Sequence, residues 1–157
     1  MNFCFSNLVI QAKEIYSPAN KNNVAKMQPE VYSFIKRPEN HYYEFNSVGP
    51  KGRIKKVVEY YRCREFDGEV FNLAFGDWDE KNHRINVMAV TNNSDSDKVL
   101  ATVAATVIDF MKAHPDATLI ATGSTLSRAR LYQMAIGRKW NEISPIFEVK
   151  GYAAGSW

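Results

Sequence analysis

The sequence has few cysteines and no long apolar run. Only Cys4 and Cys63 occur among its 157 residues, which is too few for a disulfide framework and favours a reducing compartment. No apolar stretch approaches the roughly 18 residues that a membrane-spanning helix needs. No Lys or Arg precedes Lys13, so the basic start of a secretory signal is missing. These absences predict a cytoplasmic protein with no membrane partner.

Several familiar catalytic patterns are also missing. The chain contains no Walker loop, no dinucleotide-binding fingerprint and no Gly-x-Ser-x-Gly nucleophile elbow. His41, His83 and His114 are isolated and lack the spacing of zinc ligands. Asp77 and Asp79 occupy a predicted turn, but the segment lacks the calcium-loop pattern. We therefore predict no metal and no cofactor, and the sequence leaves open whether the protein is an enzyme.

What is present is the composition of a globular domain. Hydrophobic residues make up 45% of the chain and charged residues 24%, and the length suits one compact domain. Residues 1–26 differ from the rest because a short apolar patch is followed by a polar, turn-rich stretch at 17–23. We predict an N-terminal extension over 1–26, either poorly ordered or forming a docked helix over 7–16, and a single domain over 27–157.

The body of the chain changes its hydrophobic period part-way along. Alternating and β-branched segments predict strands at 41–45, 54–63, 70–75 and 85–91, with turns at 49–52, 67–68 and 76–82. Helical spacing then predicts a helix over 99–111 that Pro115 ends, a strand at 118–122, a helix over 126–136 and a strand at 147–149. The predicted class is α/β (α+β), a mixed sheet in which an antiparallel meander precedes αβαβ, with helices packed on the sheet.

The strongest candidate site is the predicted turn from the 118–122 strand into the next helix. Free N–H groups and the helix dipole make such a turn an anion site, and arginine suits phosphate or carboxylate. The alternative is an ordinary capped helix whose arginines are solvated. The predicted phosphate-binding or anion-binding residues are Gly123, Ser124, Thr125, Ser127, Arg128 and Arg130.

Charge is segregated along the chain although the net charge is only +3. The stretch 51–64 is basic and the stretch 65–80 is acidic. A basic strand with interleaved tyrosines can supply phosphate contacts and stacking surfaces, whereas charges on adjacent strands can also neutralise each other. The predicted nucleic-acid-binding residues are Lys51, Arg53, Lys55, Lys56, Tyr60 and Arg62.

Several segments together resemble a bacterial family of uncharacterised proteins of about this length. They are 43–54 with its Gly49-Pro50-Lys51-Gly52 turn, 72–77, 91–93, 98–103, and 123–132. The resemblance covers roughly residues 27–151 and implies a domain of unknown function with Met27 as the family-like start. Family members more often carry Thr where this chain has Ala129. The order of elements also resembles the ribonuclease-H-like layout, without the carboxylate expected on its first strand.

Three functional hypotheses remain open at this point. The first is a module that binds phosphate or nucleic acid, RNA or single-stranded DNA rather than duplex DNA, since no duplex-reading motif occurs; a toxin–antitoxin or defence system would suit it. The second is an enzyme acting on a nucleotide or phosphate ester, with Asp77, Asp79 or Tyr132 near the chemistry. The third is a protein-interaction module or homo-oligomer in which Trp78, Trp140 and Trp157 mark the partner surface.

Overall fold

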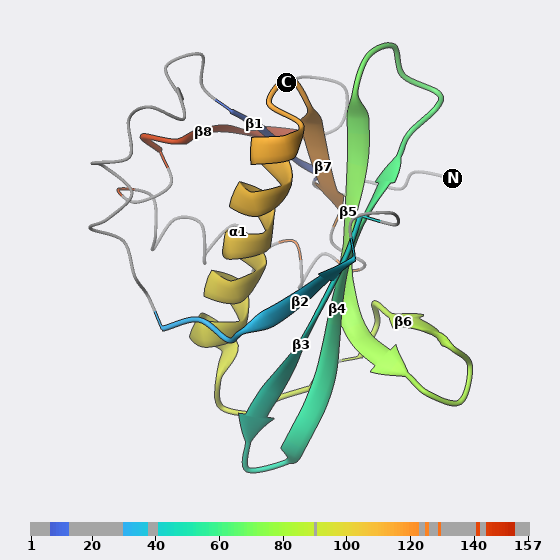
Figure 1. Ribbon diagram of the computed structural model, residues 1–157, viewed down its shortest axis with the longest axis vertical. Coiled ribbons are helices and arrows are strands. Elements are labelled where there is room, and N and C mark those ends of the chain that lie inside the picture. The colour runs from blue at the N-terminus through green and yellow to red at the C-terminus, as the bar shows by residue number, and fades with distance from the viewer. Residues whose placement is uncertain are drawn as a thin grey trace. The chain divides into compact units, whose positions relative to one another are not determined.

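A computed structural model describes residues 7–12, 30–37, 41–89, 91–122, 125, 129, 141 and 144–152. Its elements, in chain order, are β1 (Asn7–Ala12), β2 (Phe34–Arg37), β3 (Tyr42–Gly49), β4 (Gly52–Arg62), β5 (Val70–Asp79), β6 (Arg84–Asn86), α1 (Ser96–Ala113), β7 (Thr118–Thr122) and β8 (Phe147–Tyr152). Figure 1 shows them along the chain.

The strands confirm the predicted mixture of sheet and helix. Hydrogen bonds join them in the order β2-β3-β4-β5-β7-β1-β8, and β6 pairs with β5. The contacts divide the chain into two units. The helix-bearing unit comprises the described residues within Gln28–Tyr61 and Leu73–Phe110, and the terminal unit those within Met1–Met27, Arg62–Asn72 and Met111–Trp157.

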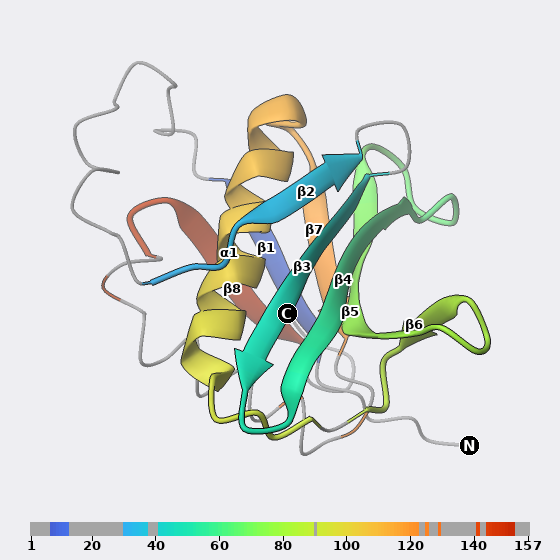
Figure 2. The same ribbon diagram turned by 60° about the horizontal axis from the view of Figure 1, so that its bottom comes forward.

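In the helix-bearing unit, α1 packs on one face of the β3–β4 hairpin. Both views show α1 along one side of β2, β3 and β4 (Figures 1 and 2). The Tyr60 ring stacks on Phe110 of α1 at 4.2 Å between centroids, and the Tyr43 hydroxyl donates to Asp109 of α1 at 2.8 Å. Side chains of a strand alternate between its two faces. The inner face, toward α1, therefore carries Tyr43, Phe45, Ser47, Ile54, Lys56, Val58 and Tyr60.

The outer face of the hairpin carries the residues between these. Its members are Tyr42, Glu44, Asn46, Val48, Arg53, Lys55, Val57, Glu59 and Tyr61. Val48 is 53% exposed and Tyr61 50%, whereas Tyr43 and Tyr60 on the inner face are each 1% exposed. The side away from α1 thus offers partly exposed side chains toward its two ends, while Val57 between them is fully buried.

The terminal unit is built around β1. This strand lies between β7 and β8 and is antiparallel to both, so β7 and β8 run parallel to each other without being neighbours. The Thr118 N–H donates to the Glu69 carbonyl and the Cys63 N–H to the Val70 carbonyl, each at 2.8 Å. The chain between Cys63 and Val70 turns at Gly68, whose φ of 84° is favourable only for glycine.

Three predicted elements differ from the structure, and one strand of the structure was not predicted. The helix predicted over 7–16 is wrong for its described part, because Asn7–Ala12 is a strand with partners on both sides. The turn predicted to begin at residue 76 begins only after Asp79, since β5 continues to that residue. The strand predicted at 85–91 is three residues long. β2 was not predicted, and the helix predicted over 126–136 lies almost wholly outside the described residues.

Other predictions are confirmed. β3, β4 and the start of β5 form the predicted antiparallel hairpin elements, and β7 and β8 cover the predicted last strands. The predicted helix is α1, and the Val99 N–H donates to the Asp95 carbonyl, which places Asp95 at the N-cap. Within the part of the chain that the structure describes, no helix has the length and apolar character needed to cross a membrane.

Candidate functional site

A hydrogen-bonded network fixes the turn between β3 and β4. Asn93, only 2% exposed, accepts from the Lys51 N–H at 2.8 Å through its side-chain oxygen. Its side-chain nitrogen donates to the Ser47 hydroxyl at 2.9 Å and to the Gly52 carbonyl at 3.1 Å. The Ser47 hydroxyl in turn donates to Asp95 at 2.6 Å. The loop before α1 thus holds the 49–52 turn in one position.

Gly49 is required by this arrangement. A Cβ at that position would lie 2.0 Å from the Asn93 carbonyl oxygen, far closer than two such atoms can approach. The 91–95 loop can therefore cross the end of β3 only because residue 49 has no side chain. The turn is consequently a rigid platform for the side chains that it carries.

The outer face next to this turn is basic. Lys51 and Arg53 are exposed, and neither forms an ion pair with any residue in the described ranges. Lys55 lies beside them, with Nζ 3.3 Å from Glu44 Oε2 and 5.3 Å from the centre of the Trp78 ring. We call Lys51, Arg53 and Lys55 the basic end of the outer face.

The far end of the same face is acidic and aromatic. Tyr42 lies opposite Glu59 in the register and two residues from Glu44. Partial burial, followed by the charge of Glu44 and a hydrogen bond to it, raises the pKa of Tyr42 to about 12. Charge therefore changes sign along the hairpin, and an anion is favoured only at the basic end.

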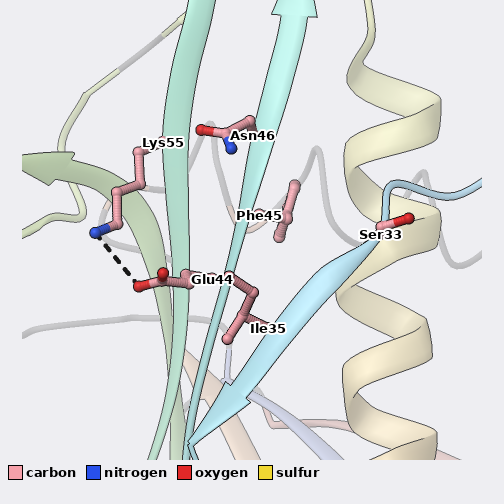
Figure 3. Close-up of a pocket in the computed structure, with 6 residues that line it drawn as sticks. All are labelled: Ser33, Ile35, Glu44, Phe45, Asn46 and Lys55. Atoms are coloured by element: carbon pink, nitrogen blue, oxygen red, sulfur yellow. Dashed lines mark ion pairs between the residues drawn. The ribbon is translucent and has the colours of Figure 1, made fainter.

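A hollow of about 160 Å³ opens between β2, β3 and β4. Figure 3 shows Lys55 and Glu44 directed toward each other, with Ile35 of β2 beside Glu44. Ile35 is 60% exposed and supplies an apolar wall. Ser33, Phe45 and Asn46 complete the lining. The hollow thus combines a cation, a carboxylate, an amide and an apolar surface next to the basic end.

The predicted basic set is only partly on this surface. Lys56 is 6% exposed and Tyr60 1%; both are on the inner face, so they are not available to a ligand in this structure. Lys56 instead forms an ion pair with Asp77. Arg62 belongs to the terminal unit, where it donates to the Gly68 carbonyl at 3.2 Å. Arg53 and Lys55 are on the outer face, and Lys51 lies in the exposed turn next to it.

Most of the predicted anion-binding turn lies outside the described residues. The members outside the described residues are Gly123, Ser124, Ser127, Arg128 and Arg130. The anion site therefore stays a prediction. Of the six, the structure describes Thr125, and its carbonyl accepts from the Ala129 N–H at 3.0 Å. That four-residue spacing is the one expected where a helix begins.

The candidate catalytic carboxylates already have structural partners. The Asp77 carboxylate binds Lys56 and accepts from the Thr91 hydroxyl. Asp79 accepts from the backbone N–H groups of Lys81 and Asn82, and hydrogen bonds from Asn82 hold its pKa below the usual range. Within the described ranges, no cluster of His, Cys, Asp and Glu is arranged to hold a metal ion.

Cys63 is buried, and burial is the main cause that raises the pKa of its thiol. The neighbouring arginines therefore do not create a reactive thiolate there. Cys63 is therefore a packed thiol of the interior.

Comparison with known families matches residues 28–157 to the family of unknown function DUF6934. The chain belongs to this family. No curated protein and no solved structure matches it. The DUF6934 match begins just after Met27, the residue at which the sequence resemblance placed the family-like start. The segments that carried the resemblance around residues 49–52, 77 and 91–93 meet in the network and ion pair described above.

Proposed function

We propose that this DUF6934 protein is a nucleic-acid-binding module that holds single-stranded RNA or DNA against the basic end of its outer face. The observation that carries the proposal is that Lys51 and Arg53 are exposed, form no ion pair within the described ranges, and lie where the hairpin turn meets the face that is not packed against α1. Phosphate contacts by Lys and Arg supply most of the affinity in nonspecific binding of this kind.

Aromatic groups on the same side favour a single strand. Trp78 lies against Lys55 at the basic end, and Tyr61, at the other end of β4, is 50% exposed on the outer face. Unpaired bases stack on such rings, whereas the bases of a duplex are already stacked on one another. A single strand therefore gains stacking energy here that a duplex does not.

Rigidity supports the same proposal. Asn93 fixes the turn that bears Lys51, so little backbone entropy is lost when the turn meets a phosphate. The resemblance to a ribonuclease-H-like layout remains a prediction about topology and does not contribute to this proposal.

The experiment is fluorescence anisotropy with labelled 12-mers of uridine and of thymidine over a series of salt concentrations. We expect K51Q/R53Q to weaken binding of both 12-mers. The slope of log affinity against log salt should become shallower by about 1.4, because each lost phosphate contact contributes roughly 0.7 for a single strand.

The matched control is K81Q/K112Q, which removes the same charge at two exposed lysines outside the β3–β4 hairpin. It should change the slope much less than K51Q/R53Q does. Equal effects of the two double variants, or no binding of either 12-mer at low salt, would overturn the proposal.

A further inference from the structure

The hollow beside β2 has the chemistry of a site for one nucleobase. It offers a cation at Lys55 and a carboxylate at Glu44, whose charged atoms are 3.3 Å apart. Asn46 lies directly opposite Lys55 in the register and lines the same hollow. Proteins read the edges of unpaired bases with donors and acceptors placed side by side.

We infer that this hollow selects guanine within a bound single strand, an inference that rests on the proposed function. The Watson–Crick edge of guanine presents the O6 acceptor followed by two donors, N1–H and the N2 amino group. The Lys55 ammonium can donate to O6, while the two oxygens of Glu44 accept from N1–H and N2–H, since a carboxylate accepts two parallel hydrogen bonds. Uracil offers only one donor between two acceptors and leaves one carboxylate oxygen unmatched.

The size of the hollow agrees with a single base. At about 160 Å³ it is smaller than the roughly 300 Å³ at which pockets for whole small molecules begin. Ile35 provides an apolar contact for one face of the ring. The sugar and phosphate would remain outside, toward Lys51 and Arg53.

The existing ion pair does not prevent entry. The Lys55 and Glu44 side chains are 36% and 15% exposed, and pairs that water reaches contribute little to stability. When guanine binds, the Lys55 ammonium exchanges Glu44 for O6, and the Glu44 carboxylate exchanges Lys55 for N1–H and N2–H. Both charged groups therefore keep a hydrogen-bond partner.

The first test uses the full wild-type chain and therefore does not depend on a variant that folds. Anisotropy compares a uridine 12-mer with the same strand carrying one central guanosine, and with inosine in that position. Inosine keeps O6 and N1–H but lacks the amino group. We expect the guanosine strand to bind roughly tenfold more tightly than the uridine strand, with inosine intermediate.

The second test replaces Glu44. E44Q should abolish the preference for guanosine while leaving affinity for the uridine 12-mer the same or higher, because a negative charge near the phosphates is removed. The matched control is E59Q, which removes a carboxylate from the same face at its acidic end. It should retain the preference for guanosine.

The outcomes separate the two proposals. Equal affinity of wild type for the three strands, or a guanosine preference that survives in E44Q, would overturn guanine selection while nucleic-acid binding stands. Failure of every strand to bind would overturn both.

Discussion

Asn93 shows how one side chain determines the position of a surface turn. Its amide contacts the Lys51 N–H, the Ser47 hydroxyl and the Gly52 carbonyl. No sequence motif predicts that Asn93 bonds the distant 49–52 turn, because an asparagine in a Thr-Asn-Asn stretch before a helix is equally consistent with an ordinary helix cap. The sequence gives only an indirect indication. A turn with glycine on both sides of Pro50 and Lys51 is flexible by itself, so a fixed turn there requires hydrogen bonds from another segment.

Removing the Asn93 amide should destabilise the protein measurably. In N93A, the Lys51 N–H and the Gly52 carbonyl lose the side chain that they bond, and the Ser47 hydroxyl keeps only its bond to Asp95. We therefore expect a loss of about 1–3 kcal/mol in the free energy of unfolding. Urea denaturation followed by circular dichroism measures it. N92A is the control, because Asn92 is exposed and surface substitutions usually change stability by less than about 0.5 kcal/mol. Equal stability of the two variants would contradict the role given to Asn93.

Tyr42 gives the outer face an alkaline pH dependence. Its pKa in the folded chain is raised to about 12, while an unfolded tyrosine titrates near 10. Between these values the unfolded state loses the proton first, so stability conferred by Tyr42 is complete below pH 10 and is lost as the pH rises toward 12.

Y42F should therefore lose stability less steeply than wild type between pH 10 and 12. Urea midpoints at pH steps across this window measure the difference, and between pH 7 and 9 the gap between the two proteins should stay constant. Parallel curves up to pH 12 would show that Tyr42 does not contribute in this way.

At the scale of elements, β4 and β5 are joined on the inner face by a buried ion pair. Lys56 and Asp77 come from these two strands, and their side chains are only 7% and 15% exposed. The Thr91 hydroxyl also donates to Asp77. A buried charge that loses its partner is costly, whereas replacement of both charges by apolar groups is often tolerated.

D77A should therefore destabilise the protein by about 3–5 kcal/mol, and K56M/D77L should be clearly more stable than D77A. A double-mutant cycle from urea denaturation measures the coupling. The matched control is the Glu44–Lys55 pair, whose carboxylate is as exposed as that of Asp77 but whose lysine is 36% rather than 7% exposed. The lysine left unpaired in E44A is reached by water, so E44A should cost at most about 1 kcal/mol. Additive effects at Lys56 and Asp77 would contradict the role of the pair.

The elements that local patterns predict correctly are those with strong local signals. The 49–52 turn and the alternation along residues 52–62 predict the β3–β4 hairpin, and helical spacing with Pro115 predicts α1. β1 and β2 were missed because each is short and depends on distant partners: β1 pairs with β7 and β8. An apolar run of six residues fits either helix or strand until its neighbours are known.

The candidate site, too, could be predicted from the sequence only in part. The basic stretch could be found from composition, but which of its residues face outward depends on what covers the sheet. Alternation placed Lys56 and Tyr60 on a common face, and only the packing of α1 shows that this face is buried. Glu44 and Asn46 were missed because their relevance comes from the register opposite Val57 and Lys55, a contact across the hairpin rather than along the chain.

At the scale of the whole molecule, the net charge of +3 hides an uneven distribution. On the outer face of the hairpin, Lys51 and Arg53 lie near the turn, Glu59 lies toward the other end, and Lys55 pairs with Glu44 between them. Part of the basic stretch is neutralised on the inner face. The total therefore says little about ligand binding, while the local arrangement predicts a small anion-binding surface with strong salt dependence.

The central proposal is that nucleic acid meets the outer face of the β3–β4 hairpin and not the face that α1 covers. Backbone amide chemical shifts, followed by NMR while an unlabelled uridine 12-mer is added to the ¹⁵N-labelled full chain at low salt, test it most directly. We predict that the largest changes fall at residues 51–55 and at Trp78, with little change along α1. Changes that concentrate on α1, or no saturable change anywhere, would contradict the account.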